Sequence, residues 1–219
     1  MDVGANLAAV RDRIAAAGGD ERVRLIAVTK GFGADAVEAA VRAGVPDVGE
    51  SYAQELVAKA AQVTGPPPVW HFIGRLQTNK VKAVAGLVEL WHTVDRATLG
   101  DELARRAPGA RVLLQVNVSD EPQKGGCLPA EAPNLVKRLR QGGLEVVGLM
   151  AVGATGPAEA ARPGFRALTR LADRLGLPER SMGMSGDLEV AVEEGSTMVR
   201  VGRALFGDRP RPGADDPSH

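Results

Sequence analysis

The sequence has a single cysteine, no cluster of charge of one sign and no long hydrophobic run. Cys127 alone cannot form an intramolecular disulfide, and 27 basic residues balance 27 acidic ones. This balance argues against a nucleic-acid partner, which would demand a basic face. No apolar run approaches the roughly 20 residues that cross a bilayer, so no membrane partner is expected. The N-terminus carries charges where a signal peptide needs an apolar stretch, so we expect a cytoplasmic protein.

Strand-like and helix-like segments alternate along the 219 residues. The segments between the apolar runs have apolar residues three and four positions apart, as one buried helix face requires. The runs themselves are apolar at nearly every position, which suits parallel strands covered on both faces. The predicted strands are residues 23–29, 46–50, 69–74, 87–94, 111–119, 145–152, 181–185 and 198–206.

Eight strand–helix repeats predict an α/β protein with a single (β/α)8 barrel, the TIM-barrel fold, over residues 1–207. The segment from Asp2 to Ala17 is predicted to be an extra helix before the first strand. An open doubly wound sheet is the alternative. It is disfavoured because the first strand–helix turn lacks G-x-G-x-x-G spacing and no P-loop motif occurs. The proline-rich residues 208–219 are predicted to form a disordered tail.

The segment LIAVTKGFG ends a buried run on Lys30, at a strand tip where a barrel holds its chemistry. A lysine that loses hydration in a barrel mouth has a lowered pKa, and its neutral amine attacks aldehydes and ketones. The alternative is a strand-end lysine that extends its ammonium group into solvent. Lys30 taken alone favours this simpler interpretation.

The loops after the last two predicted strands have the composition of an anion site. They read SMGMSGDLE and VRVGRALFG, and barrels commonly bind phosphate in these loops. The Ser185 hydroxyl can either donate to a phosphate or cap the helix that follows, and Gly202 allows a close backbone approach. Together with Lys30, these loops would hold a phosphorylated aldehyde. Pyridoxal 5′-phosphate fits that description.

Several motifs resemble those of the pyridoxal-phosphate homeostasis protein family, also called the proline synthetase co-transcribed homologue family. They are AVTKG, VGESYAQE, WHFIGRLQTNK, QVNVSDE, GLMAV and SMGMSGDLEVAVEEGSTMVRVGRALFG, between Leu25 and Gly207. That family is similar to the barrel domain of bacterial alanine racemase. The resemblance implies an internal aldimine of pyridoxal 5′-phosphate on Lys30 and Arg200 facing the pyridine nitrogen. The expected cofactor-binding residues are Lys30, Ser51, His71, Met150, Ser181, Ser185, Arg200, Gly202 and Arg203.

The residues argue against catalysis. A guanidinium beside the pyridine opposes ring protonation and weakens the cofactor as an electron sink; the alternative for Arg200 is a structural ion pair, for example with Glu189. A racemase needs a base on each face of the α-carbon, and Lys30 supplies at most one. Tyr52 is the only tyrosine, predicted beside the cofactor or at the rim. The histidines are scattered without metal-ligand spacing, so no metal is expected. For His71, the alternative to a place in the cofactor site is a structural role in its strand.

We therefore predict a non-enzymatic protein that holds pyridoxal 5′-phosphate and controls its supply. Cofactor-dependent apo-enzymes are the further partners that the resemblance implies, and both a monomer and a weak dimer are open. One alternative is an enzyme, either a weak racemase or a class I aldolase with Glu50 as the acid–base partner of Lys30. Another is a scaffold barrel that retains the phosphate site without imine chemistry.

Three positions depart from the pattern expected of the family. The sequence Gly31-Phe32-Gly33 stands where a proline is usual, which predicts a more flexible first loop. Ser51 replaces an asparagine and has a shorter reach. Arg203 replaces a threonine, so its backbone N–H or its guanidinium would contact phosphate instead. Lys124, in the loop EPQKGG, is predicted to be solvated.

Overall fold

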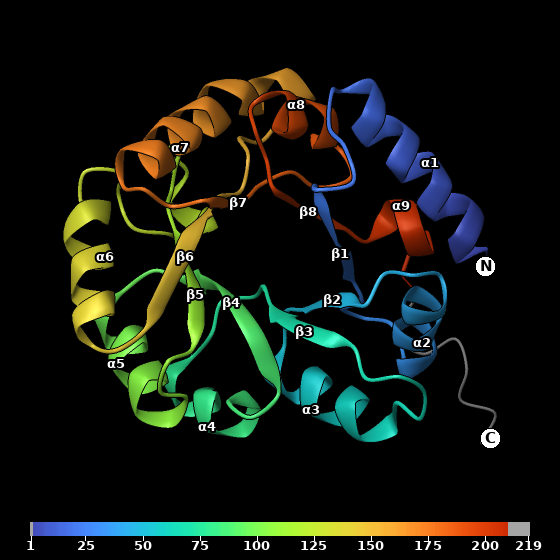
Figure 1. Cartoon of the computed structure of the whole chain (residues 1–219), viewed down its shortest axis with the longest axis horizontal. Coiled ribbons are helices and arrows are strands. Elements are labelled where there is room, and N and C mark those ends of the chain that lie inside the picture. Colours follow the sequence, from blue (N-terminus) through green and yellow to red (C-terminus); the bar gives the residue numbers. More distant parts are fainter. Residues whose placement is uncertain (1, 210–219) are drawn as a thin grey trace.

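The computed structural model describes residues 2–209, and its eight strands close into a parallel barrel in the order β1 to β8. Figure 1 shows the strands at the centre with the helices arranged around them. The predicted (β/α)8 fold is therefore confirmed. The strands are β1 (Arg24–Val28), β2 (Asp47–Glu50), β3 (Val69–Phe72), β4 (Val88–Val94), β5 (Arg111–Gln115), β6 (Glu145–Met150), β7 (Glu179–Ser181) and β8 (Met198–Val201).

Helices cover the outside of the barrel. The α-helices are α1 (Val3–Ala16), α2 (Ala34–Arg42), α3 (Ala53–Gln62), α4 (Val81–Val84), α5 (Ala97–Arg106), α6 (Ala132–Gln141), α7 (Arg162–Arg174), α8 (Leu188–Glu193) and α9 (Arg203–Phe206). Three 3-10 turns lie in the connections: η1 (Thr78–Lys80), η2 (Pro122–Lys124) and η3 (Ala158–Ala161). Most of the predicted tail, residues 210–219, lies outside the described residues.

The last two strands end earlier than the sequence predicts. β7 ends at Ser181, so the predicted strand 181–185 is mostly loop. Gly183 adopts a φ of +93°, a left-handed conformation that favours glycine and interrupts the extended strand backbone. β8 ends at Val201, and α9 takes up the end of the predicted strand 198–206. A short apolar run cannot distinguish a strand from an equally buried turn or helix.

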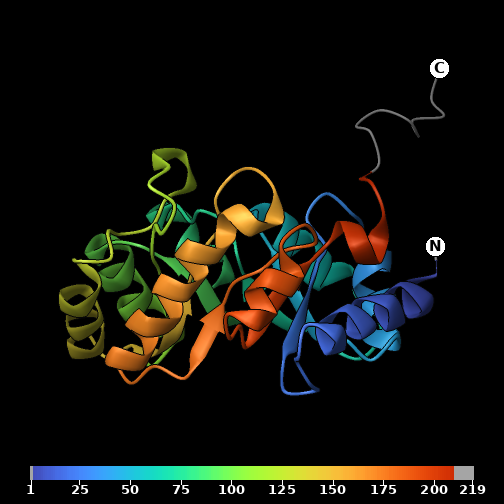
Figure 2. The same cartoon turned by 90° about the horizontal axis from the view of Figure 1, so that it is seen from above.

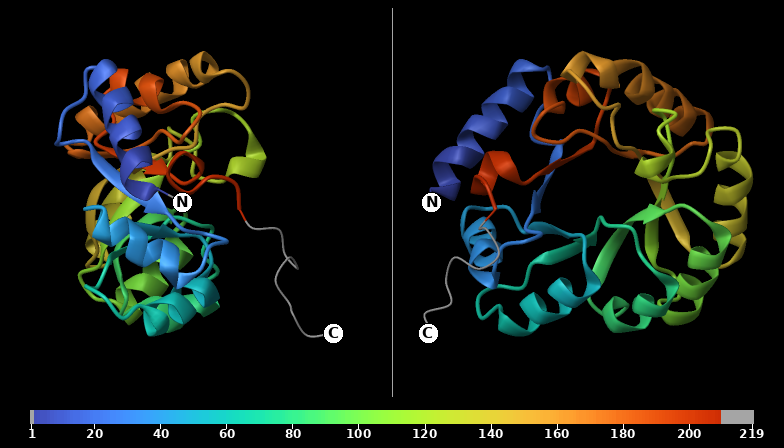
Figure 3. Two further views of the ribbon diagram at one scale, coloured as in Figure 1. Left: turned by 90° about the vertical axis from the view of Figure 1, so that its right-hand side faces the viewer. Right: turned by 180° about the vertical axis from the view of Figure 1, so that it is seen from behind.

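The extra helix α1 covers the side of the barrel that the short α9 leaves open. Val10 and Ile14 of α1 pack in one apolar cluster with Leu188 of α8 and Phe206 of α9. Figures 1 and 3 show α1 lying beside α8 and α9. The Asp2 side chain accepts a hydrogen bond from the N–H of Ala5 at 3.0 Å and so caps the helix. This helix thus completes the outer layer.

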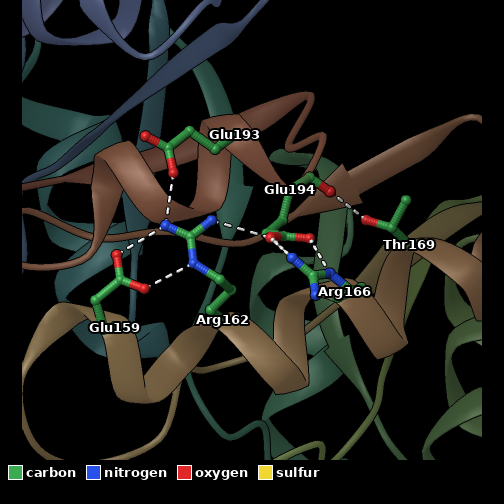
Figure 4. Close-up of polar contacts among 6 residues, drawn as sticks. All are labelled: Glu159, Arg162, Arg166, Thr169, Glu193 and Glu194. Carbon is green, nitrogen blue, oxygen red and sulfur yellow. Dashed lines mark hydrogen bonds and ion pairs between the residues drawn. The ribbon is translucent and has the colours of Figure 1, made fainter.

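A network of ion pairs fastens α8 to α7 (Figure 4). The Arg162 guanidinium contacts Glu159 at 2.7 Å, Glu193 at 2.6 Å and Glu194 at 3.0 Å. Arg166 contacts Glu194 at 2.7 Å. The network thus fixes the carboxyl end of α8 against α7.

The loops that follow the strands gather at one end of the barrel. In Figure 2 the loop with η2 rises highest at this end, and α9 lies on the same side. The carboxyl ends of parallel strands share one end of a barrel, so the predicted strand-tip residues meet there. This end is the place to look for a site.

Candidate functional site

A cavity of about 690 Å³ opens at the carboxyl ends of β1, β6 and β8 and at the loop after β7. Its wall includes apolar side chains, among them Met150 and Val152, and several cationic ones. Three of the predicted site residues do not line it: Ser51, His71 and Ser181. The predicted residues that do line it are Lys30, Met150, Ser185, Arg200, Gly202 and Arg203.

Lys30 follows β1 and its side chain lines the cavity. Burial lowers the pKa of Lys30, and the nearby cations Arg209 and Arg200 lower it further, whereas Glu50 acts in the opposite direction. A lowered pKa increases the fraction of neutral amine at a given pH. The surroundings of Lys30 therefore favour its action as a nucleophile.

The loop after Lys30 is restrained by contacts on both sides. Gly31 has a φ of +77°, which a side chain would strain, and its N–H donates to Oε2 of Glu55 at 2.9 Å. The ring of Phe32 packs against that of Phe206 with centroids 5.3 Å apart. The glycines that predict a flexible loop are thus accompanied by contacts that anchor it.

Glu50 forms a buried ion pair instead of facing the cavity as a free acid. Its carboxylate accepts hydrogen bonds from Nζ of Lys59 and, at 2.7 Å, from Oγ1 of Thr29. Lys59 also donates to the carbonyl oxygen of Thr29 at 2.8 Å and contacts Glu55 at 3.1 Å. Burial raises the pKa of Glu50, and the pairing with Lys59 counteracts this. These contacts bind α3 to the ends of β1 and β2, directly before Lys30.

Ser185 and Gly202 lie together at the start of α9. The Ser185 hydroxyl accepts a hydrogen bond from the N–H of Ala204 at 3.4 Å. Asp187 occupies the N-cap position of α8, without a capping hydrogen bond from its side chain, so the prediction that Ser185 can cap this helix is wrong. A Cβ atom on Gly202 would lie 3.1 Å from the carbonyl oxygen of Val28. Glycine therefore allows the ends of β8 and β1 to approach closely at the cavity wall.

α1 holds the same wall from outside. The Arg13 guanidinium donates to the carbonyl oxygen of Ser185 at 2.9 Å. Nδ2 of Asn6 donates to the carbonyl oxygen of Leu205 at 2.8 Å. The helix before the barrel thus holds the loop at Ser185 and helix α9, which lie at the anion end of the cavity.

Arg200 is almost completely buried, with its guanidinium fixed from two strands. Nη1 donates to the carbonyl oxygen of Ser181 at 2.8 Å and to its hydroxyl at 2.6 Å, and Nη2 donates to the carbonyl oxygen of Ala151 at 2.9 Å. Burial lowers the pKa of Arg200 to about 10, which leaves it charged at neutral pH. The alternative of an ion pair with Glu189 is wrong, because Glu189 pairs with Arg13 at 2.6 Å.

The remaining predicted residues lie elsewhere. Ser51 and Tyr52 line a neighbouring cavity of about 590 Å³, and Tyr52 is 56% exposed at its rim. His71 is completely buried, and its Nδ1 lies 2.9 Å from Nε2 of His92. The histidines at 71 and 92 are therefore paired in space and not scattered.

Lys124 is not the solvated lysine that the sequence predicts. Its ammonium group contacts Glu121 at 2.6 Å and donates to the carbonyl oxygen of Gly153. It therefore ties the loop after β5 to the loop after β6.

Sequence reasoning missed Met184, Asp208 and Arg209 in the cavity wall. Met184 lies within the long C-terminal motif, directly before Ser185, and this adjacency was the available signal. Asp208 and Arg209 belong to a segment whose composition pointed to a tail.

Among residues 2–209, no group of three or more His, Cys, Asp or Glu side chains is placed to hold a metal ion. Within the same range, no helix has the length and apolar character needed to span a bilayer.

The arrangement has a definite chemical capacity. An amine with a lowered pKa lies at β1, and a close-packed turn with the Ser185 hydroxyl and Gly202 lies at β8. Arg200 lies on the same wall, and Met150 adds an apolar surface. The cavity can hold a small anion at one end and present an amine to an aldehyde at the other.

Comparison with known proteins gives a consistent family. Residues 3–210 match the model of the alanine racemase N-terminal domain. The pyridoxal phosphate homeostasis protein of Pseudomonas aeruginosa is 43% identical over 211 residues, covering 92% of each chain. PipY of Synechococcus elongatus, in a structure with PLP bound, is 32% identical with a TM-score of 0.82, covering 94% of this chain and 100% of that one. Alanine racemase of Clostridium difficile is 14% identical with a TM-score of 0.74, covering 96% of this chain and 60% of that one, a likeness of fold alone.

Proposed function

Since this chain belongs to the pyridoxal phosphate homeostasis protein family, we propose that it binds pyridoxal 5′-phosphate through Lys30 and takes part in the homeostasis of this cofactor. The observation that carries the proposal is one cavity lined by both Lys30, whose pKa is lowered, and the Ser185–Gly202 wall. An aldehyde group and a phosphate on one molecule need these two features together.

The residues of the cavity fit the cofactor. The Ser185 hydroxyl and the tight turn at Gly202 suit a phosphate, and Arg203 lines the same wall, with its exposed guanidinium 3.8 Å from Asp208. Met150 offers an apolar surface for a ring. The guanidinium of Arg200, almost completely buried at the cavity wall, suits a ring nitrogen that accepts a hydrogen bond. The volume of about 690 Å³ exceeds what so small a molecule needs, so the mouth stays open.

Each residue then has a defined task. When bound, the cofactor supplies an aldehyde and, in enzymes, an electron-accepting ring. Lys30 would provide the amine that bonds to the aldehyde carbon with loss of water, and burial together with the nearby cations lowers its pKa and so favours the neutral amine. Ser185 and the turn at Gly202 orient the phosphate. Arg200, which stays charged, keeps a proton off the ring nitrogen and so opposes the use of the ring as an electron sink.

We further propose that the chain is a carrier and not an enzyme. Racemisation at an α-carbon needs a base on each face of the substrate, and Lys30 supplies at most one. Glu50 is held by Lys59, and Tyr52 lines the neighbouring cavity. A reversible bond to Lys30 sequesters an aldehyde that would otherwise modify amines, and we expect transfer from it to cofactor-dependent apo-enzymes in the cytoplasm. A weak racemase or an aldolase is less well supported because the two acid–base candidates, Glu50 and Tyr52, are held by Lys59 and placed in the neighbouring cavity, respectively.

Titration of the protein with pyridoxal 5′-phosphate tests the proposal. We expect a new absorbance band, distinct from that of the free cofactor, which saturates at one equivalent per chain. Lys30→Ala should abolish the band, whereas Lys82→Ala, which removes an exposed lysine of α4, should retain it. A band that persists in Lys30→Ala, or its absence in the unaltered protein, would contradict the proposal.

A further inference from the structure

A line of hydrogen-bonded polar side chains, called the file below, crosses the interior of the barrel beneath the cavity. It consists of Arg200, Ser181, His92, His71 and Asp47. His92 lies on β4 and Ser181 on β7, two strands that are not neighbours in the closed barrel. The bond of 2.9 Å between Nδ1 of His92 and Oγ of Ser181 therefore spans the inside of the barrel. Both residues are completely buried, and polar groups at such positions are costly unless they are hydrogen-bonded.

The file begins at Arg200 and ends at Asp47. Nη1 of Arg200 lies 2.6 Å from Oγ of Ser181, which bonds to His92 as described. Nε2 of His92 lies 2.9 Å from Nδ1 of His71. Nε2 of His71 lies 2.8 Å from Oδ1 of Asp47, the first residue of β2. The file thus runs from the cavity wall to the opposite end of the barrel.

Hydrogen-bond chemistry gives every bond in the file the same direction. A guanidinium only donates, so Oγ of Ser181 accepts from Arg200, which leaves its own O–H free to donate to Nδ1 of His92. A neutral His92 then carries its proton on Nε2 and donates to Nδ1 of His71. His71 in turn donates from Nε2 to the carboxylate of Asp47, which only accepts. Burial, with the nearby His71 and Arg200, holds the pKa of His92 well below its ordinary value, which keeps this ring neutral.

We infer that His92 and His71 are positioning residues for Arg200, acting through the hydroxyl of Ser181. A serine hydroxyl rotates, and it can turn either its proton or its lone pairs towards a neighbour. With His92 as a fixed acceptor, the proton points away from Arg200 and a lone pair points towards it. Asp47 fixes the tautomer of His71, and His71 fixes that of His92. The function assigned to Arg200 rests on the proposed cofactor, whereas the file is a property of the chain itself.

Space filling alone does not explain these histidines. The neighbouring interior positions hold apolar side chains that form a cluster of their own, Leu90, Leu113, Val147, Met150 and Met198. A pair of imidazoles beside this cluster adds directional bonds that apolar residues of similar volume lack. Because Arg200 has a flexible stem, these bonds reduce the orientations open to its guanidinium.

The tautomers can be measured on the cofactor-free protein. Nitrogen-15 NMR of the imidazole rings at neutral pH should show His71 and His92 both protonated on Nε2 and unprotonated on Nδ1. Ser181→Ala should change the Nδ1 signal of His92, because its donor is lost. A His92 protonated on Nδ1, or a doubly protonated His71, would overturn the inferred direction of the file.

The effect on the cofactor is tested with variants in the holoprotein. His92→Leu and Ser181→Ala should each weaken cofactor affinity by about tenfold, the scale of one hydrogen bond to a charged group, and shift the absorbance maximum of the bound cofactor. His92→Gln should restore both, because an amide can accept from Ser181 and donate to His71. Ser196→Ala is the matched control: it removes another buried hydroxyl, which bonds to the carbonyl oxygen of Met182 at 2.7 Å.

The outcomes separate this inference from the proposed function. Unchanged affinity and spectrum in a folded His92→Leu or Ser181→Ala protein, or equal changes in Ser196→Ala, would overturn the positioning role. If His92→Leu does not fold, Ser181→Ala alone decides. If the unaltered protein binds no cofactor, the proposed function fails, while the tautomers measured without cofactor still decide whether the file exists.

Discussion

The chemistry of the cavity depends on a few side chains whose surroundings alter them. Lys30 has a lowered pKa through burial and two nearby guanidinium groups, those of Arg209 and Arg200. Arg200 stays charged although it is buried, and its bonds to Ser181 and Ala151 fix its direction. A nucleophilic amine and a fixed cation in one pocket suit reversible capture of an aldehyde more than chemistry at a carbanion.

Removal of the Arg209 guanidinium should raise the pKa of Lys30. In Arg209→Ala the protonated amine loses a repelling neighbour, so the midpoint of the pH dependence of cofactor association should move to higher pH. Stopped-flow absorbance measures this rate, and Arg22→Ala, which removes a distant exposed guanidinium, should leave the midpoint in place. A midpoint that stays constant or falls in Arg209→Ala would refute the role given to this charge.

A side chain at position 202 should disturb the anion end of the cavity. In Gly202→Ala the new Cβ would lie 3.1 Å from the carbonyl oxygen of Val28, so β1 and β8 must shift apart. We expect a loss of about 1–3 kcal/mol in unfolding free energy, as for other overpacked sites, together with weaker cofactor binding. Gly86→Ala, where a Cβ meets nothing within 4 Å, is the control for chemical denaturation and for cofactor titration. Equal behaviour of the two variants would argue against close packing at Gly202.

Single helices support the site through contacts with the strand ends. α3 supports the end of β2 through Lys59 and its buried partner Glu50. α1 supports the site from outside, through bonds from Arg13 to the loop at Ser185 and from Asn6 to Leu205 of α9. α8 in turn is fastened to α7 by the ion pairs of Arg162 (Figure 4). Elements that hold no ligand thus determine where the binding residues lie.

Loss of Lys59 should destabilise the protein strongly. In Lys59→Met the buried Glu50 loses its hydrogen-bonded cationic partner, and breaking such a pair typically costs about 3–5 kcal/mol. The double variant Lys59→Met with Glu50→Leu should recover much of this loss, because no unpaired charge remains. Urea denaturation of the parent and both variants measures the effect.

The Glu50–Lys59 pair also predicts how the unfolding free energy of Lys59→Met depends on pH. Glu50 has a raised pKa in the folded protein, and without Lys59 it should rise further. An acid whose pKa is higher in the folded than in the unfolded protein contributes stability below its unfolded pKa, near 4.5. This stability is lost as the pH rises through the folded pKa. The difference in unfolding free energy between parent and Lys59→Met should therefore be smaller near pH 4.5 than at pH 7. A difference independent of pH would show that Glu50 is not the group left unpaired.

The closed barrel brings residues from both ends of the chain to one cavity. β1 and β8 are paired, with Ile26 beside Arg200 and Ala27 beside Val201. This pairing places Lys30 and Gly202 on the same wall although they are far apart in the sequence. α1 then covers these strands from outside (Figure 3). Closure of the sheet, and not sequence proximity, assembles the site.

Periodicity made the barrel predictable, and the order of the strands placed Lys30, Arg200 and Gly202 at one end. The pattern could not predict which side chains meet inside. From the sequence alone, His71 and His92 are two separate strand histidines, because their pairing depends on the register between β3 and β4. Ser51 was expected in the cavity, but the chain after β2 places it in the neighbouring one. Contacts between distant segments set such details, and apolar spacing carries no information on them.

The most direct measurement of the central claim maps the residue that bonds to the cofactor. The purified protein is loaded with pyridoxal 5′-phosphate, reduced with borohydride, digested and examined by mass spectrometry. The account predicts one reduced adduct per chain, on the peptide that contains Lys30, and none in Lys30→Ala. A stoichiometric adduct on another lysine, or no adduct on the loaded protein, would contradict it.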